Sequence, residues 1–161
     1  MINSLQMQPL HLQRIKEAAM SKIIRHLTAI SRCGVEYRKQ YLSNMSIDGR
    51  YARYLLEVCD RPGISQEGLS QRLLLDKSTV ARQCATFEEN GFLLRRPSLE
   101  DRRILQLFPT EKTLALLPQL TEAWDSWEAL LTEDLSDEEK RIVADLLVKM
   151  KVKARQWMEA H

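Results

Sequence analysis

The chain has 161 residues, with 24 Lys and Arg against 22 Asp and Glu, so its formal net charge is +2. This length suits one domain of average size, and the low content of 5 Gly and 5 Pro favours long helices over folds with many turns. No apolar run approaches the roughly 18 residues that a membrane span needs. The first residues also lack the basic start and apolar stretch of a signal peptide. We therefore expect a cytoplasmic, mainly α-helical protein without a membrane segment.

The small net charge conceals an asymmetry along the chain. Residues 1–49 carry 7 basic and 3 acidic groups, residues 50–105 carry 10 and 8, and residues 106–161 carry 7 and 11. A basic front and an acidic rear would suit two terminal segments that pack against each other. Charged helix faces in water would explain the same counts, so the pattern leaves both interpretations open.

Apolar spacing predicts long helices at both ends of the chain. From about Leu10 to Cys33, apolar residues recur at intervals of three and four, and Gly34 is expected to end or bend this helix. Near the other end, Thr110 is expected to cap a long helix that Pro118 kinks. A capping box of Ser and Glu then opens the last helix. The apolar stripes of these two helices are Leu117, Leu120, Trp124, Trp127 and Leu131, then Val143, Leu146, Met150, Ala154 and Trp157.

The middle of the chain predicts a helix-turn-helix followed by a β-hairpin. A helix over 48–60 is stopped by a Pro-Gly pair. Ser65 and Asp76 then occupy N-cap positions of two further helices, the second of which ends at Gly91. Beyond it the apolar period changes from 3.6 to 2, which predicts strands over 92–96 and 102–108, with Pro109 breaking the second.

This order of elements describes a winged helix-turn-helix over 48–108. The fold class is therefore mainly α with a small antiparallel hairpin. Helical parts over 10–45 and 110–160 flank the winged part.

The predicted helix over 77–90 carries candidate DNA-reading residues. Val80, Cys84 and Phe87 share one face and are expected to pack inward. The opposite face carries residue types that contact base edges and phosphates, near the end of a recognition helix that enters the major groove. The same residues would also be ordinary on the surface of any amphipathic helix. The candidates are Ser78, Thr79, Arg82, Gln83 and Thr86.

The predicted hairpin adds a second set of candidates, since Arg95, Arg96, Arg102 and Arg103 bracket its turn. An arginine at the tip of a projecting hairpin can enter a narrow minor groove, where the negative potential favours it. Asp101 is expected to orient a neighbouring arginine, because a carboxylate facing phosphates is repelled. The alternative is a solvated, charge-rich turn. Helix and hairpin together favour double-stranded DNA as the partner.

The large side chains on the terminal helices, such as Trp124, Trp127 and Trp157, require a partner surface. Pairing with a second copy around a two-fold axis would bury them. It would also present two recognition helices to half-sites about one DNA turn apart. Packing within a monomer is the alternative.

The segments 64–70, 77–82 and 87–93 resemble the helix-turn-helix of MarR-type transcriptional regulators. The run Asp101-Arg102-Arg103, followed by Thr110-Glu111-Lys112, is similar to the wing of that family and the start of its next helix. By motif the resemblance covers about 50–113, and by element order it covers nearly the whole chain, so we expect 1–161 to form a single unit of this type. It implies a homodimer on a pseudo-palindromic operator, usually a repressor. The recognition role then falls on Ser78, Thr79, Arg82 and Gln83, and the wing role on Arg102 and Arg103.

The chain also departs from this pattern. Ser70 stands where Ala is usual, Pro109 where an aliphatic residue is usual, and Thr113 where Gly is usual. The last two change how the wing joins the following long helix, which bears on half-site spacing.

The resemblance further implies release of DNA by small aromatic or phenolic ligands, or by oxidants. Residues His26, Tyr51, Tyr54 and Trp124 are candidates for lining a ligand pocket between the long helices and the winged part, although core packing would explain each of them. A redox-sensing thiol needs a lowered pKa and access to solvent. Among the three cysteines, Cys33, Cys59 and Cys84, we expect Cys84 in the core and Cys33 near a helix end.

Two other classes of function are weaker. A protein-interaction module on the same scaffold is favoured by the modest charge of residues 50–105, but Arg82 and the hairpin arginines argue against it. Catalysis has little support, because His11, His26 and His161 form no metal-ligand pattern. There is also no Gly-rich phosphate loop or nucleophile elbow. We expect no enzyme activity, no metal and no cofactor.

Overall fold

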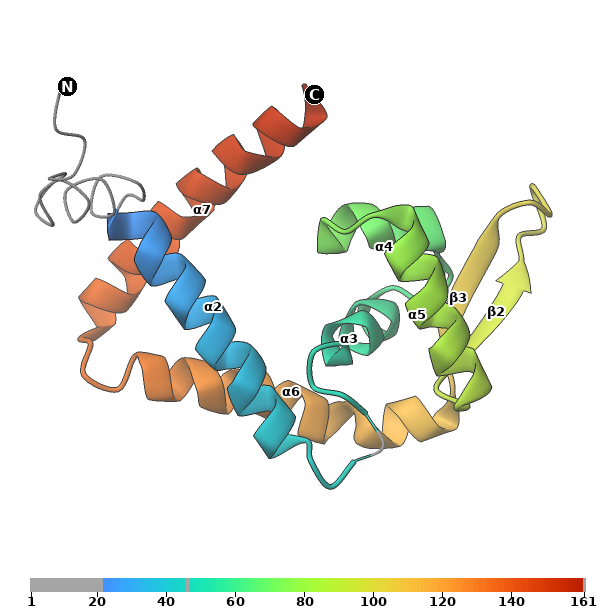
Figure 1. The fold of residues 1–161 in the computed structure, drawn as a ribbon, viewed down its shortest axis with the longest axis horizontal. Helices are drawn as coiled ribbons and strands as arrows, with labels where there is room; N and C mark the ends of the chain where they lie inside the picture. The colour runs from blue at the N-terminus through green and yellow to red at the C-terminus, as the bar shows by residue number, and fades with distance from the viewer. Residues whose placement is uncertain (1–21, 46, 161) are drawn as a thin grey trace, which may run out of the picture.

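A computed structural model describes residues 22–45 and 47–160. It confirms the predicted class, since the described chain is mainly helical with one small antiparallel sheet (Figure 1). The predicted helix before residue 22 lies outside the described residues, as do His11 and His161. The elements in chain order are α2 (Lys22–Tyr41), α3 (Ala52–Asp60), β1 (Ile64–Ser65), α4 (Gln66–Leu73), α5 (Lys77–Glu89), β2 (Leu93–Pro97), β3 (Leu105–Pro109), α6 (Glu111–Leu131) and α7 (Asp137–Glu159).

The hydrophobic core lies in the winged helix-turn-helix and under the first half of α6. Helices α3, α4 and α5 bury Leu55, Leu69 and Val80 completely, and α6 adds Leu120. Each such side chain contributes about 1.5–3 kcal/mol by leaving water. Helix α6 runs from the base of the hairpin to the far end of the molecule, where α7 begins and the start of α2 lies (Figure 1). It therefore links the two parts of the chain.

The sheet has three strands in the order β1-β3-β2, all antiparallel. Sequence reasoning missed β1, whose Ile64 pairs with Leu107. The predicted strand bounds were also early, because residues 98–104 form a longer loop than expected. The second strand ends at Pro109, one residue later than expected, and Pro109 still pairs with Leu93. A strand end tolerates proline, which has no N–H to donate.

Local capping signals are confirmed. The Ser65 hydroxyl accepts the Gly68 N–H at 3.0 Å, and Gly91 has a φ of +72°. The Ser136 and Glu139 side chains each accept from the backbone of the other, which completes the predicted capping box. Helix α3 begins four positions later than expected, because the Asp48 carboxylate accepts the Arg50 N–H at 2.9 Å and closes a turn instead.

Gly34 does not end the first helix, because α2 continues through it to Tyr41. Gly34 is buried, and a Cβ at this position would lie 2.8 Å from Trp127 Nε1 of α6. Glycine in mid-helix costs about 0.5–1 kcal/mol relative to alanine. Because Gly34 has no side chain, α2 and α6 can approach closely at this point.

Gly49 is buried against the backbone of α2, and its replacement tests this contact. A Cβ would lie 2.5 Å from the carbonyl oxygen of Arg38, an atom that cannot move without displacing the helix. We expect Gly49→Ala to lower the free energy of unfolding by about 2–3 kcal/mol, measured by urea denaturation. The control is Gly91→Ala, which meets open space and carries only the cost of a positive φ, about 1–2 kcal/mol. Equal losses in the two variants would contradict the packing argument.

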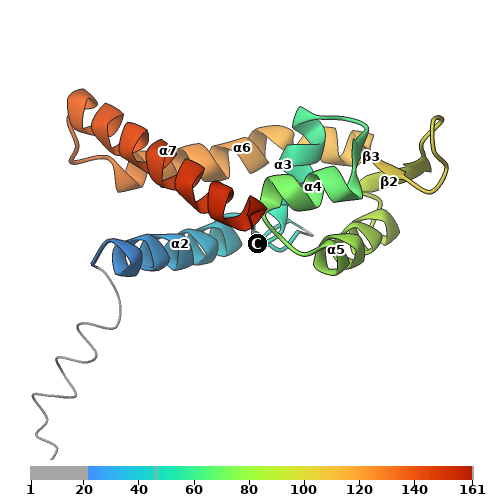
Figure 2. The ribbon, with the colours of Figure 1, turned by 90° about the horizontal axis from the view of Figure 1, so that it is seen from above.

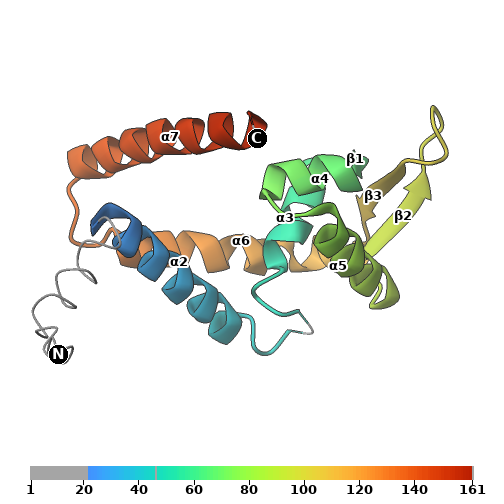
Figure 3. The same cartoon turned by 45° about the horizontal axis from the view of Figure 1, so that its top comes forward.

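Helix α7 contains no buried residue in this single chain. Figure 3 shows it lying apart from α6, and Figures 2 and 3 show its C-terminal end toward α4. Its predicted apolar stripe is exposed, with Val143 at 44% and Leu146 at 52%. Large apolar side chains are also exposed on α2 and near the end of α6, namely Ile23, Ile24, Ile30, Leu130 and Leu131. Among the described residues, no helix is both long and apolar enough to cross a bilayer.

Candidate nucleic-acid interface

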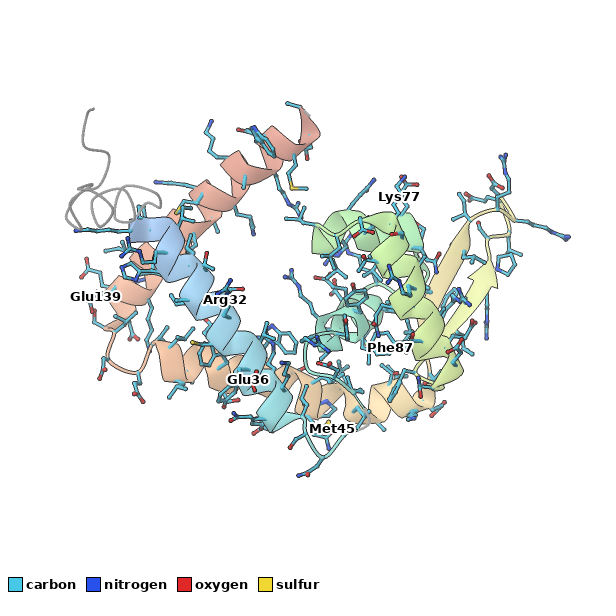
Figure 4. All side chains as sticks on the ribbon, in the orientation of Figure 1. Arg32, Glu36, Met45, Lys77, Phe87 and Glu139 are labelled. Carbon is cyan, nitrogen blue, oxygen red and sulfur yellow. The ribbon has the colours of Figure 1, made fainter. Side chains whose placement is uncertain are left out.

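Helix α5 is oriented by its apolar face, as the spacing predicted. Val80, Cys84 and Phe87 are buried, and the Phe87 ring contacts the edges of Tyr54 and Phe92 with centroids 6.2 and 6.0 Å away. Figure 4 shows Phe87 on the side of α5 toward α3, with Lys77 at the outer end of the same helix. The polar face of α5 is consequently turned away from the core.

The predicted contact residues lie on this outer face. Ser78, Arg82 and Thr86 are exposed, while Thr79 and Gln83 are half-buried. Arg82 makes no ion pair with any described residue. Its guanidinium therefore keeps all its donors for a ligand.

The start of α5 is held by Asp76. Its Oδ1 accepts the Ser78 hydroxyl at 2.7 Å and the Thr79 N–H at 2.7 Å. These hydrogen bonds hold the pKa of Asp76 well below its usual range, so the carboxylate is charged at a helix N-terminus, where negative charge is favourable. The Ser78 proton is engaged within the chain, and the Ser78 oxygen is left to accept.

The wing loop presents two arginines. Arg102 is exposed, and Arg103 is 90% exposed while it pairs in a bidentate manner with Asp101. Both of the Asp101–Arg103 side-chain contacts measure 3.0 Å, and Asp101 also accepts the Arg103 N–H. The Arg103 hydrogen bonds lower the pKa of Asp101, which keeps the pair charged. This is the geometry expected of a carboxylate that orients a neighbouring arginine.

The two arginines of β2 have different surroundings. Arg96 is exposed, and its guanidinium lies 5.4 Å from the centroid of the Phe108 ring. Arg95 instead points at the Glu88 carboxylate of α5, with Nε and Oε2 2.7 Å apart. Sequence reasoning treated these arginines alike and did not single out Glu88.

A hollow of about 300 Å³ lies among the start of α4, the start of α5 and the wing, and Gln66 and Glu67 line it from α4. Lys77 and Ala81 line it from α5, and Arg103 lines it from the wing loop. Sequence reasoning also missed Lys77, which pairs with Glu67 at 2.6 Å. The sequence offered one signal for Lys77, which is its position as the first residue of α5, directly after the N-cap Asp76. The recognition helix and the wing thus border one surface.

The four candidate pocket residues are not all brought together, although Tyr51 and Tyr54 are in contact. Tyr54 is buried in the core with its ring edge against Tyr51, and Trp124 lies beneath the Arg38 guanidinium, 4.5 Å from it. His26 is exposed near the start of α2. At about 1.5 Å rise per residue it lies about 18 Å along the helix from Arg38. His26 therefore does not join the aromatic residues of its own chain.

The cysteines differ in exposure. Burial raises the pKa of Cys84 to about 11 and also raises the pKa of half-buried Cys59. Both shifts oppose thiolate formation, which a redox sensor requires. Cys33 is exposed on α2.

The first turn of α6 is tied to the end of α5. The buried Thr113 hydroxyl donates to the Phe92 carbonyl at 2.5 Å, and the Thr110 hydroxyl donates to the Gly91 carbonyl at 2.8 Å. The Lys112 ammonium donates to the Asn90 carbonyl at 2.9 Å. The unusual Thr113 therefore helps to hold the long helix against the recognition helix.

Thr113→Val removes this hydroxyl with little change in shape and leaves a buried carbonyl with one partner fewer. We expect the free energy of unfolding to fall by about 1–2 kcal/mol, read from the shift of the urea midpoint. The matched control is Thr121→Val in the same helix, whose exposed hydroxyl donates only to the Leu117 carbonyl. If both variants unfold at the same urea concentration, the buried hydrogen bond contributes nothing.

Comparison with known proteins agrees with this geometry. Residues 52–105 match the MarR family. The chain is 29% identical over 133 residues to the uncharacterized HTH-type transcriptional regulator YybA of Bacillus subtilis, covering 80% of this chain and 85% of that protein. A MarR transcriptional regulator from Methanosarcina mazei is 26% identical, with a TM-score of 0.79 over 83% of this chain and 96% of that one.

A putative MarR family regulator from Listeria monocytogenes, solved in complex with a 26mer DNA, is 25% identical. Its TM-score is 0.81, over 85% of this chain and 91% of that chain. The family match covers residues 52–105, and the structural likeness covers more than four fifths of the chain. Residues 52–105 therefore match the MarR family, and the fold of the described chain is that of winged helix-turn-helix transcriptional regulators.

Proposed function

We propose that the protein is a homodimeric repressor that binds a pseudo-palindromic operator and is released by a small ligand. The observation that carries the DNA-binding part is the shared surface of Lys77 and Ala81 on α5 with Arg103 on the wing. One surface that joins a recognition helix to a projecting hairpin can engage a major groove and the adjacent minor groove together.

The residue roles follow from exposure and chemistry. Arg82 and Gln83 read base edges, because guanidinium and amide groups make bidentate contacts with guanine and adenine. Thr79 and Thr86 contact bases or phosphates through their hydroxyls, whereas Ser78, whose proton is held by Asp76, accepts from a base amino group. On the wing, the arginines occupy the minor groove, and Asp101 holds one of them in place. These wing residues are Arg96, Arg102 and Arg103.

The dimer is formed by the helical parts over 10–45 and 110–160, while 48–108 carries the DNA contacts. Support comes from the exposed stripe of α7 together with the exposed isoleucines of α2 and leucines of α6. Large apolar surfaces of this kind are typical of protein interfaces. A two-fold dimer buries them and repeats the recognition helix at a second half-site.

The effector site lies where α2 meets α6, at the Arg38 guanidinium above Trp124. The buried Nε of Arg38 has no hydrogen-bond partner among the described residues. Burial lowers the pKa of Arg38, and so does the nearby positive charge of Arg53. A small aromatic carboxylate supplies both a counter-charge and a ring to stack there. Benzoate should therefore weaken operator binding by the wild type more than benzyl alcohol does, and Arg38→Met should remove the difference.

A selection of protein-bound fragments from genomic DNA tests the proposed operator. The expected result is a shared inverted repeat with half-sites about one helical turn apart. A selection that returns no shared sequence would contradict the proposal and favour a protein-interaction module.

A further inference from the structure

Glu88 joins the recognition helix to the wing through both of its carboxylate oxygens. Oε1 accepts the backbone N–H of Arg95 at 3.2 Å, and Oε2 accepts the Arg95 Nε at 2.7 Å. The Arg95 Nη2 lies 2.5 Å from the same Oε2. One side chain of α5 therefore holds both the main chain and the side chain of a single residue of β2.

The position of β2 makes this contact consequential. β2 is an edge strand of the three-stranded sheet, and among the strands of the described chain it pairs only with β3. On its free edge, the Arg95 N–H points to α5 and is satisfied by Glu88. Beyond Arg95 the chain continues through Pro97 into the wing loop. The Glu88–Arg95 contact therefore anchors the wing to the recognition helix.

Charge alone would argue against a carboxylate here. A negative group close to bound DNA opposes the counterion-driven attraction that phosphate contacts supply. Arg95, which could have been a phosphate contact, is also occupied by Glu88, and only 26% of its side chain is exposed. The Glu88–Arg95 contact therefore lowers the electrostatic attraction to DNA, but it fixes the position of the wing relative to α5.

We propose that Glu88 and Arg95 are positioning residues that set the wing at one angle to the recognition helix, and that they determine sequence selectivity. This inference rests on the proposed DNA-binding function. This Glu88–Arg95 contact, which we call the clamp, keeps the major-groove contacts of Arg82 and the minor-groove contacts of Arg102 in one register on the duplex. Arg95 thereby acts on DNA through the wing and not by direct contact.

The test compares Glu88→Ala, Glu88→Gln and the control Glu89→Ala. Glu89 is the neighbouring exposed carboxylate, so its loss changes the charge equally without breaking the clamp. Fluorescence anisotropy would give the affinity ratio between a selected operator and a scrambled duplex. We expect Glu88→Ala to lower this ratio at least tenfold while binding the scrambled duplex as tightly as the wild type or more tightly.

Glu88→Gln separates positioning from charge, because its amide oxygen can still accept from Arg95. We expect Glu88→Gln to retain a selectivity ratio between those of the wild type and Glu88→Ala, and Glu89→Ala to leave the ratio unchanged. An effect of charge alone would instead make all three variants bind both duplexes tighter by one common factor. That result would overturn the inference.

Amide hydrogen exchange of the DNA-free protein separates this inference from the function on which it rests. Glu88→Ala should speed exchange at the Arg95 amide and in the wing loop, whereas Glu89→Ala should not. Unchanged exchange at Arg95 in Glu88→Ala would overturn the clamp, whatever the DNA results. If the wild type itself bound the operator and the scrambled duplex equally, the proposed function would be contradicted. The exchange rates would still show whether Glu88 holds Arg95.

Discussion

Arg82→Ala should weaken binding to the operator by about 30-fold or more at about 0.1 M salt. Arg82 is exposed on the outer face of α5 and has no ion-pair partner among the described residues, so nothing inside the chain competes for its donors. A bidentate contact between arginine and guanine is worth about 1–3 kcal/mol, and a dimer carries two copies. The loss should be much smaller on a scrambled duplex, because base contacts and not phosphates are removed.

The control is Arg141→Ala on α7, which removes the same charge from an exposed position outside the proposed DNA surface. Anisotropy titrations of both variants on both duplexes provide the measurement. Equal losses for Arg82→Ala and Arg141→Ala would mean that only the total charge matters. That outcome would contradict a reading role for Arg82.

Leu146→Glu should convert the dimer into a monomer. Leu146 lies in the middle of the α7 stripe and is 52% exposed in the single chain, so its replacement disturbs little within the protomer. In a two-fold interface the same change places two unpaired carboxylates in an apolar contact, and burying unpaired charge costs several kcal/mol. Light scattering after size-exclusion chromatography should report the mass of one chain, with an unchanged circular dichroism spectrum. Operator affinity should fall with it, because the two half-sites are no longer bound together.

Val148→Glu is the matched control for this prediction. Val148 is 51% exposed on the same helix but lies on the side away from the stripe. It should leave the mass of the dimer unchanged. A dimer that survives Leu146→Glu, or one that dissociates equally in both variants, would contradict an interface built on this stripe.

Features set by neighbouring residues were predictable from the sequence. The caps at Ser65, Asp76 and Ser136 depend on a side chain and an N–H three positions apart. The inner face of α5 was predictable because its buried apolar residues recur with the helical period of 3.6, and all of them pack on one core. These signals were sufficient for the order of the elements and for the outer face that carries Arg82.

Features set by distant residues were not predictable. Gly34 looked like a helix end, because only contact with Trp127 on another helix shows that it serves close packing. β1 is two residues long and exists through its pairing with β3, whose partner Leu107 is far along the chain.

The arginines of the wing posed the same difficulty. Arg95 and Arg103 have the same charge in the same hairpin, yet one is held by Glu88 across the turn and the other by Asp101 beside it. Spacing does not distinguish these partners. Which carboxylate each arginine contacts depends on the direction of its strand and on the turn at Gly91, which brings β2 back along α5.

The central claim is that this chain recognises a specific DNA sequence, and its own upstream region is the first duplex to use. Fluorescence anisotropy should compare that duplex with a scrambled one over several salt concentrations. We predict tight binding to the upstream duplex, weaker binding to the scrambled one, and a linear fall of the logarithm of the binding constant with the logarithm of salt concentration. Equal, weak and salt-independent binding to both duplexes would contradict the account.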